Sequence, residues 1–178
     1  MEEGPRTGSR DRVRLARFRP HFKCAGRGGR ATSERRFSAR RFRNSRSAGT
    51  DADWVVKLID VYPDDAPDFE MSGYQLMVSG DIFRGRYRED LDKAKPIAAN
   101  EVLEYTLPLP HVNHTFKAGH RLMVQIQSTW FPLYDLNPQT FVPSIMFAPE
   151  TAYKAQRHRV HHSAKNATYI KIRADGGE

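Results

Sequence analysis

The residues able to do chemistry in this chain are seven histidines, a group of carboxylates and one cysteine. His111 and His114 lie three positions apart, but Pro110 precedes them and the segment suits an extended loop. They lack the helical His-Glu-x-x-His spacing of a zinc site, and the lone Cys24 supplies no second thiolate. We expect loop or core histidines bonded to the backbone, and no metal centre.

No catalytic residue is assigned. The Gly-x-Ser-x-Gly turn of a serine hydrolase is absent, and no local signature ties a serine to a histidine and an aspartate. One acidic stretch contains Asp60, Asp64, Asp65, Asp68 and Glu70. Its spacing fits no EF-hand loop, so a solvated turn is expected, with a Ca²⁺ site as the weaker alternative. No cofactor is expected.

Three arginines alternate in the sequence FRGRYR, namely Arg84, Arg86 and Arg88. In an extended chain they would share one face and could grip a partner's carboxylates by forked hydrogen bonds. We therefore interpret them as candidate interface residues, and the alternative is an ordinary solvated face.

The sequence WFPLY contains the aromatic residues Trp130, Phe131 and Tyr134. Such a cluster either packs on the core or anchors an interface. We take these three residues as further interface candidates. A sugar-stacking role is the less favoured alternative.

The second part of the chain has the pattern of strands. Apolar and polar residues alternate over 74–78, 102–107, 121–127 and 170–173, and residues 54–61 form a β-rich run. Only residues 149–156 suit a short helix, and residues 82–99 suggest a long excursion between strands. These observations predict an all-β sandwich over residues 49–174, followed by a short tail at 175–178.

The positive charge belongs to the first part of the chain. Residues 1–50 carry 15 basic and 4 acidic residues, whereas residues 51–178 carry 14 basic and 17 acidic residues, so the balances are +11 and −3. We expect residues 1–48 to form a disordered Arg-rich leader, because such a composition buries little apolar surface. The leader is interpreted as a frameshift product, a plain solvated tail or, least favoured, a nucleic-acid-binding arm.

Several segments of the body resemble one known family. They are GTDADWVVKLIDVYP at 49–63, DIFRGRYR at 81–88, LPHVNHTF at 109–116, GHRLMVQIQS at 119–128, FPLYD at 131–135, NPQT at 137–140 and HRV at 158–160. In this order they resemble the C-terminal non-catalytic domain of the X-Pro dipeptidyl-peptidase and cocaine esterase serine hydrolases. The resemblance is strongest to the α-amino-acid ester hydrolases and glutaryl-cephalosporin acylases.

This resemblance implies a galactose-binding-like jelly roll that lacks its first strands. It also implies partners, the α/β-hydrolase and cap domains of a parent enzyme, which are absent from this sequence. The family's activity label is hydrolase, of the dipeptidyl-peptidase or ester hydrolase type, and the chain alone is expected to be inactive. The alternatives are a stand-alone carbohydrate- or protein-binding module and an Arg-rich nucleic-acid binder. We find no signal peptide or membrane-spanning segment, and the compartment stays open.

Overall fold

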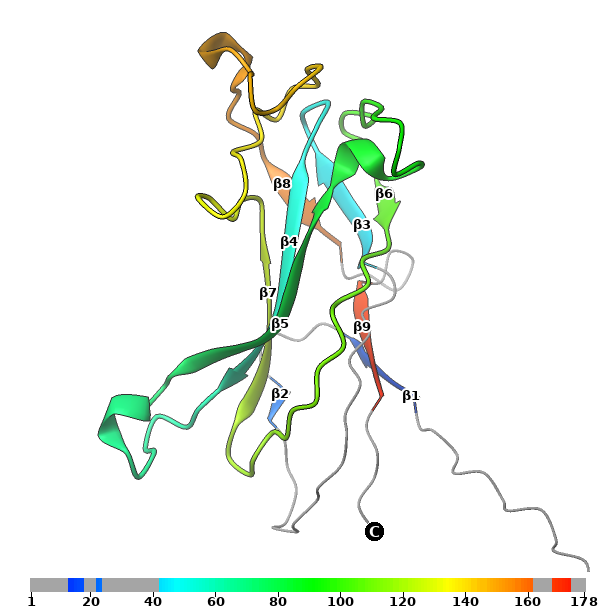
Figure 1. Ribbon diagram of the computed structural model, residues 1–178. Helices are drawn as coiled ribbons and strands as arrows, with labels where there is room; N and C mark the ends of the chain where they lie inside the picture. The colour runs from blue at the N-terminus through cyan, green and yellow to red at the C-terminus, as the bar shows by residue number, and fades with distance from the viewer. Residues whose placement is uncertain (1–12, 18–21, 24–41, 162–167, 174–178) are drawn as a thin grey trace, which may run out of the picture.

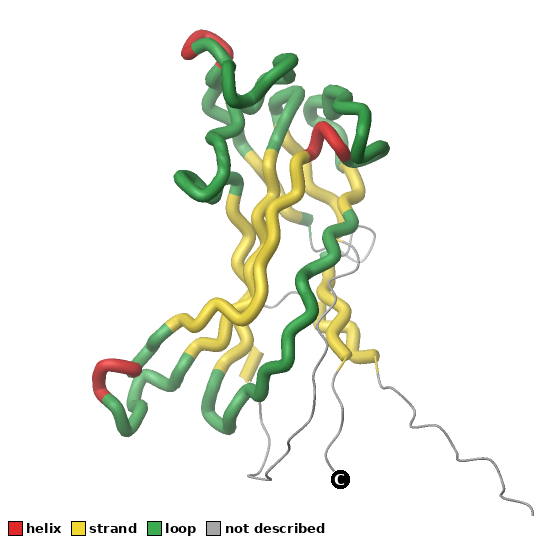
Figure 2. Tube along the Cα trace, in the orientation of Figure 1, coloured by secondary structure: helices red, strands yellow, loops and turns green. Residues whose placement is uncertain are grey.

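The computed structural model describes residues 13–17, 22–23, 42–161 and 168–173, and it consists of strands joined by long loops (Figures 1 and 2). The strands are β1 (Val13–Arg17), β2 (Phe22–Lys23), β3 (Phe42–Ser47), β4 (Asp53–Val61), β5 (Gln75–Arg84), β6 (Leu103–Tyr105), β7 (Arg121–Gln127), β8 (His158–Val160) and β9 (Tyr169–Arg173). The helices are single 3₁₀ turns, η1 (Phe69–Met71), η2 (Gly85–Tyr87) and η3 (Glu150–Ala152). None of the helices in the described ranges is long and apolar enough to cross a membrane.

The strands form three antiparallel sheets. A four-stranded sheet has the order β2-β7-β4-β5, a three-stranded sheet the order β6-β3-β8, and β1 pairs with β9. The first two sheets lie on either side of a common core, so the predicted all-β sandwich is confirmed (Figure 1).

Strand β4 is a central strand of the four-stranded sheet, because it pairs with β5 on one side and with β7 on the other. Its side chains are buried apart from the half-buried Lys57, which explains why its sequence is a nearly continuous apolar run. The core combines residues of β4 with residues of β6, of β9 and of the loops on either side of β6; its buried members are Ala52, Trp54, Val56, Leu58, Ile97, Tyr105, Leu107, Leu109 and Ile170.

The strands expected from alternation are present, with shifted ends. Strand β5 runs to Arg84, three residues into the segment predicted as an excursion, because it keeps pairing with β4 as far as Asp53. The helix expected within residues 149–156 is only the single turn η3.

The first part of the chain contains strands that sequence patterns did not indicate. Residues 1–48 were expected to be disordered, yet Phe42–Ser47 form β3, the central strand of the three-stranded sheet. Its sequence FRNSRS has no apolar alternation, and its position depends on backbone pairing with β6 and β8. Two shorter strands, β1 and β2, also fall in this part. Apart from Ala48, the rest of the expected leader lies outside the described residues, as does the tail at 175–178.

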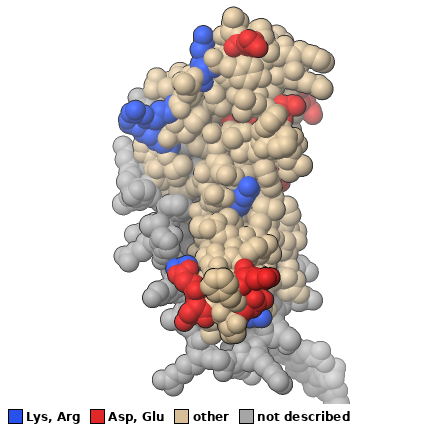
Figure 3. Space-filling view, turned by 90° about the vertical axis from the view of Figure 1, so that its left-hand side faces the viewer, with Lys and Arg blue, Asp and Glu red and all other residues tan. Residues whose placement is uncertain are grey.

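The tip of the β4–β5 hairpin carries most of the acidic stretch. Asp64, Asp65, Asp68 and Glu70 are exposed there, and Figure 3, which faces this end, shows acidic side chains on both sides of an uncharged ridge. Asp60 departs from the expected solvated turn, because it is a β4 residue that is 1% exposed. In the described part of the chain, no group of three or more His, Cys, Asp and Glu residues is arranged to hold a metal ion.

Candidate functional site

The connection between β7 and β8 presents large apolar side chains to solvent. We call its residues 129–149 the apolar loop. The exposed fractions of its large hydrophobic residues are 68% for Phe131, 66% for Leu133, 44% for Leu136, 71% for Met146 and 81% for Phe147. Apolar side chains gathered on one exposed segment are typical of a surface that docks against a partner.

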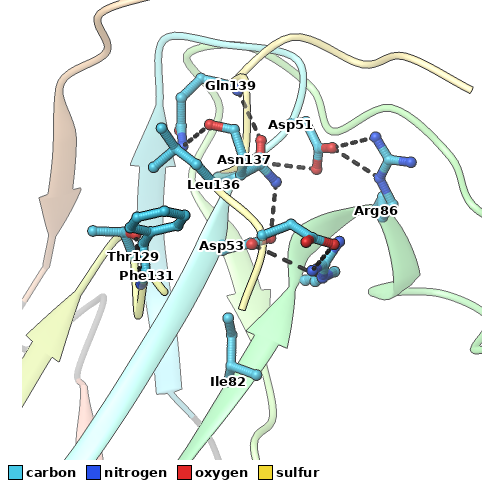
Figure 4. Close-up of polar contacts among 12 residues, drawn as sticks. Asp51, Asp53, Ile82, Arg86, Thr129, Phe131, Leu136, Asn137 and Gln139 are labelled. Atoms are coloured by element: carbon cyan, nitrogen blue, oxygen red, sulfur yellow. Dashed lines mark hydrogen bonds and ion pairs between the residues drawn. The ribbon is translucent and has the colours of Figure 1, made fainter. Parts of the chain in front are cut away.

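A buried polar cluster ties the apolar loop to the start of β4 (Figure 4). Asn137 donates through Nδ2 to Oδ1 of Asp53 at 2.8 Å, and the Asn137 Oδ1 accepts from the backbone nitrogen of Gln139 at 2.7 Å. Asn137 is 3% exposed and Asp53 is 1% exposed. Buried hydrogen bonds to a carboxylate are strong, so the loop is held in one conformation at this point.

A buried ion pair forms the second attachment. Arg86 donates through Nε and Nη2 to Oδ2 of Asp51 at 2.8 and 2.6 Å. The same guanidinium lies over the ring of Phe141 in the loop, 4.9 Å from its centroid, and the backbone nitrogen of Phe141 donates to Thr50 Oγ1 at 2.9 Å. The loop therefore packs directly on the charged pair.

At Gly49 the backbone before β4 packs directly against the backbone of the apolar loop. A Cβ atom at this position would lie 2.1 Å from the backbone oxygen of Gln139. A larger residue would force the two backbone segments apart, so glycine is required by close packing.

The three candidate arginines do not share a face. Strand β5 ends at Arg84 and the chain turns through η2, so the extended geometry assumed for them is not present. Arg84 lies between Asp53 and Asp135, at 3.9 and 3.7 Å. Arg86 is buried on Asp51, and Arg88 pairs with Glu89 at 2.6 Å. Each guanidinium meets a carboxylate of this chain, and the guanidinium of Arg86 is not available to a partner.

The aromatic candidates divide between two roles. Phe131 is exposed, whereas Trp130 is half-buried, with Lys57 Nζ 4.5 Å from its ring centroid and Tyr134 at 5.9 Å. The sequence did not indicate the four other exposed members of the loop, Leu133, Leu136, Met146 and Phe147. They lie in irregular chain, where no periodicity separates an exposed apolar residue from a core residue.

A second polar group lies near the other end of β4. Oδ2 of Asp60 is 2.8 Å from His114 Nε2, and Oδ1 is 2.9 Å from His120 Nδ1. The ring of His120 also contacts Tyr62, with 4.4 Å between centroids. His114 was expected to bond to the backbone, and this expectation is wrong, because its partner is a buried carboxylate far away in the sequence. The group attaches the loop before β7 to the central strand.

Burial raises the pKa of Asp53 from 3.8 to about 6, although the hydrogen bond from Asn137 and the charge of Arg84 act in the opposite direction. The folded chain therefore holds this proton at pH values where the unfolded chain has lost it. Between pH 3.8 and about 6 the folded state binds more protons, so the Asp53 contribution to stability falls as the pH rises through this interval.

We expect the variant D53N to lose this pH dependence. Between about pH 4 and pH 7 the free energy of unfolding of the unmodified chain should fall by roughly 2 kcal/mol relative to that of D53N. Urea denaturation at both pH values measures the difference. D135N is the control, because Asp135 also faces Arg84 but is half exposed. Equal pH dependence in the unmodified chain and D53N would contradict the assignment.

The sequence matches the family described as "X-Pro dipeptidyl-peptidase C-terminal non-catalytic domain" over residues 42–171. Among curated proteins it is similar to the cocaine esterase of Rhodococcus sp. (strain MB1 Bresler), with 38% identity over 94 residues, which are 53% of this chain and 15% of that protein.

Two solved structures are similar over most of the chain. An aminopeptidase from a marine sediment Thaumarchaeota archaeon is 55% identical, with a TM-score of 0.72 over 78% of this chain and 23% of its own length. An α-amino acid ester hydrolase is 46% identical, with a TM-score of 0.74 over 79% of this chain and 24% of its own. The chain thus spans about a quarter of the length of these two relatives.

Proposed function

The chain belongs to the family of X-Pro dipeptidyl-peptidase C-terminal non-catalytic domains, and on this premise we propose that it stabilises an α/β-hydrolase domain and helps to wall its substrate cleft. The hydrolase and cap domains would supply the chemistry, acyl transfer to water through a serine ester intermediate. The present chain would contribute surface and no nucleophile.

The exposure of the apolar loop is the observation that supports this proposal. Exposing five large hydrophobic side chains on one loop is unfavourable for a separate domain, and the buried polar cluster keeps them in place. A preorganised apolar surface binds with little loss of conformational entropy. We therefore assign the hydrolase contact to the apolar loop, with Phe131 and Phe147 as its anchors.

A binding experiment in trans tests this role. The thaumarchaeal aminopeptidase, produced without the segment that matches this chain, should bind the chain and gain thermal stability and peptidase activity. F147S should weaken that binding by about tenfold or more, since a buried aromatic anchor dominates such interfaces. F69S, at the far hairpin, is the matched control and should bind normally. Failure of the unmodified chain to bind would overturn the proposal.

A carbohydrate-binding role is less well supported. It needs an aromatic platform open to solvent, and Lys57 lies over the ring of Trp130. A nucleic-acid role would depend on the Arg-rich segment, most of which is outside the described residues. Salt-dependent binding of DNA that disappears on deleting residues 1–41 would favour it.

A further inference from the structure

The tip of the β4–β5 hairpin, residues 62–74, stands apart from the sheets at the lower left of Figure 1. Its turn η1 presents Phe69, which is 89% exposed, more than any other large hydrophobic residue in the described chain. An aromatic side chain held at the end of a projecting element is the usual form of an anchor that enters a partner's pocket.

The tip is fixed by its own contacts. The backbone nitrogen of Tyr62 donates to the carbonyl of Tyr74 at 2.9 Å, and the two rings meet edge to face at 5.9 Å. Asp68 caps η1 by accepting from the backbone nitrogen of Glu70 at 3.1 Å. Because the turn is ordered before any partner arrives, placing Phe69 in a pocket would require little further ordering.

Negative charge surrounds the anchor. Asp64, Asp65, Asp68 and Glu70 are exposed beside it, and in the described chain only Asp64 forms an ion pair, with Arg121 at 3.3 Å. The tip therefore combines an apolar centre with an acidic rim, and its partner should be an apolar pocket with a basic rim.

A groove with an apolar portion and a lysine in its wall lies at the other end of the molecule. This open groove of about 330 Å³ lies between the apolar loop and the segment that leads into β8; its lining residues are Ser128, Thr129, Leu136, Asn137, Gln139, Tyr153, Lys154, Ala155, Gln156 and His158. Leu136 and Tyr153 give it an apolar portion. Lys154 lies in its wall, and the exposed Arg157 lies in the chain between the lining residues Gln156 and His158.

We propose that the hairpin tip of one copy inserts Phe69 into this groove of a second copy, with Asp65 and Glu70 facing Lys154 and Arg157. The hairpin and the β7–β8 connection project to the same side of the molecule, one at each end (Figure 1). A two-fold axis between them brings each tip to the other copy's groove. The contact then closes as an antiparallel dimer and does not continue as a fibre.

Sedimentation velocity of the full chain tests the dimer over a roughly hundredfold range of concentration. We expect a monomer–dimer equilibrium that weakens as salt is raised, because the charged rim is exposed. F69S should weaken dimerisation by at least about tenfold. L91S is the matched control, since Leu91 is also 78% exposed but lies on another loop. A monomer at all concentrations, or equal losses in F69S and L91S, would overturn the proposal.

Charge reversal identifies the partner surface. The double variant D65K/E70K reverses the charge of the tip and spares the Asp68 cap. The double variant K154E/R157E reverses the charge at the groove. Each double variant alone should abolish the dimer. Combining all four substitutions should restore it, because the charges are then exchanged between the two sides. No restoration would exclude the groove as the contact. F69S should leave binding to the hydrolase portion intact. An experiment that finds no dimer is therefore distinguishable from one that finds no hydrolase binding.

Discussion

The variant R86M is expected to lose about 3–5 kcal/mol of unfolding free energy. Asp51 is 0% exposed, and its Oδ2 atom receives both hydrogen bonds from Arg86. Methionine keeps most of the volume but leaves a buried carboxylate without its countercharge. Small domains have total stabilities of about 5–15 kcal/mol, so this single substitution would bring the chain close to unfolding.

The control is a substitution of Arg88, which directly follows the turn η2 that contains Arg86. Arg88 pairs with Glu89, whose side chain is 48% exposed, and such an exposed pair contributes little to stability. R88M should therefore be nearly neutral in urea denaturation. The double variant D51N and R86M should recover much of the loss, because it removes both charges, and asparagine keeps the oxygen that accepts from the backbone nitrogen of Ala52. Equal losses in R86M and R88M would show that the buried pair has no special weight.

R86M should also affect the apolar loop, which is the proposed docking surface. Arg86 supports Phe141, and Phe141 is part of the apolar loop. R86M should thus weaken binding to the hydrolase portion even at temperatures where the chain is still folded. D51N with R86M should restore stability more than binding, since the guanidinium under the Phe141 ring is still missing.

The fold class could be predicted because it depends on local patterns. The run at 54–61 has the β-branched content of a buried strand, and the alternation at 121–127 follows the strand period. Strand β3 could not be predicted, because FRNSRS has neither feature and the strand is defined by partners distant in the sequence, β6 and β8. Pairing with strands distant in the sequence does not require an apolar pattern in a short polar segment, so the sequence of such a segment does not predict the strand.

The candidate site was predicted only in outline. The interface role of the aromatic segment stays a prediction, although Phe131 is exposed. The extended geometry expected for the arginines is not present. The sequence does contain the missed signal. Asp51 and Asp53 sit in a stretch that otherwise has the composition of a buried strand, and buried carboxylates require cations or donors nearby. Arg86 and Asn137 meet that requirement, although nothing in the sequence indicates which arginine or amide it is.

D60A is the second substitution with a large expected effect, because Asp60 is also a buried carboxylate with partners distant in the sequence. The Asp60 carboxylate is 1% exposed and bonds to His114 and His120, which fix the loop before β7 on the central strand. Alanine would leave two imidazole donors without an acceptor and a cavity at the edge of the core. We expect a loss of about 3 kcal/mol or more in urea denaturation. D64A is the control, since Asp64 forms an exposed pair and should cost less than about 1 kcal/mol.

The conservative variant D60N separates charge from shape. Both Asp60 oxygens accept hydrogen bonds when His114 carries a hydrogen on Nε2 and His120 carries one on Nδ1. Asparagine offers one acceptor and one donor, and it can satisfy both rings only if one imidazole changes its tautomer. We expect an intermediate loss, together with a change in the ¹⁵N shifts of one histidine ring. Unchanged ring shifts with full stability would mean that Asp60 does not hold the two histidines, and the loop before β7 would then depend on apolar packing alone.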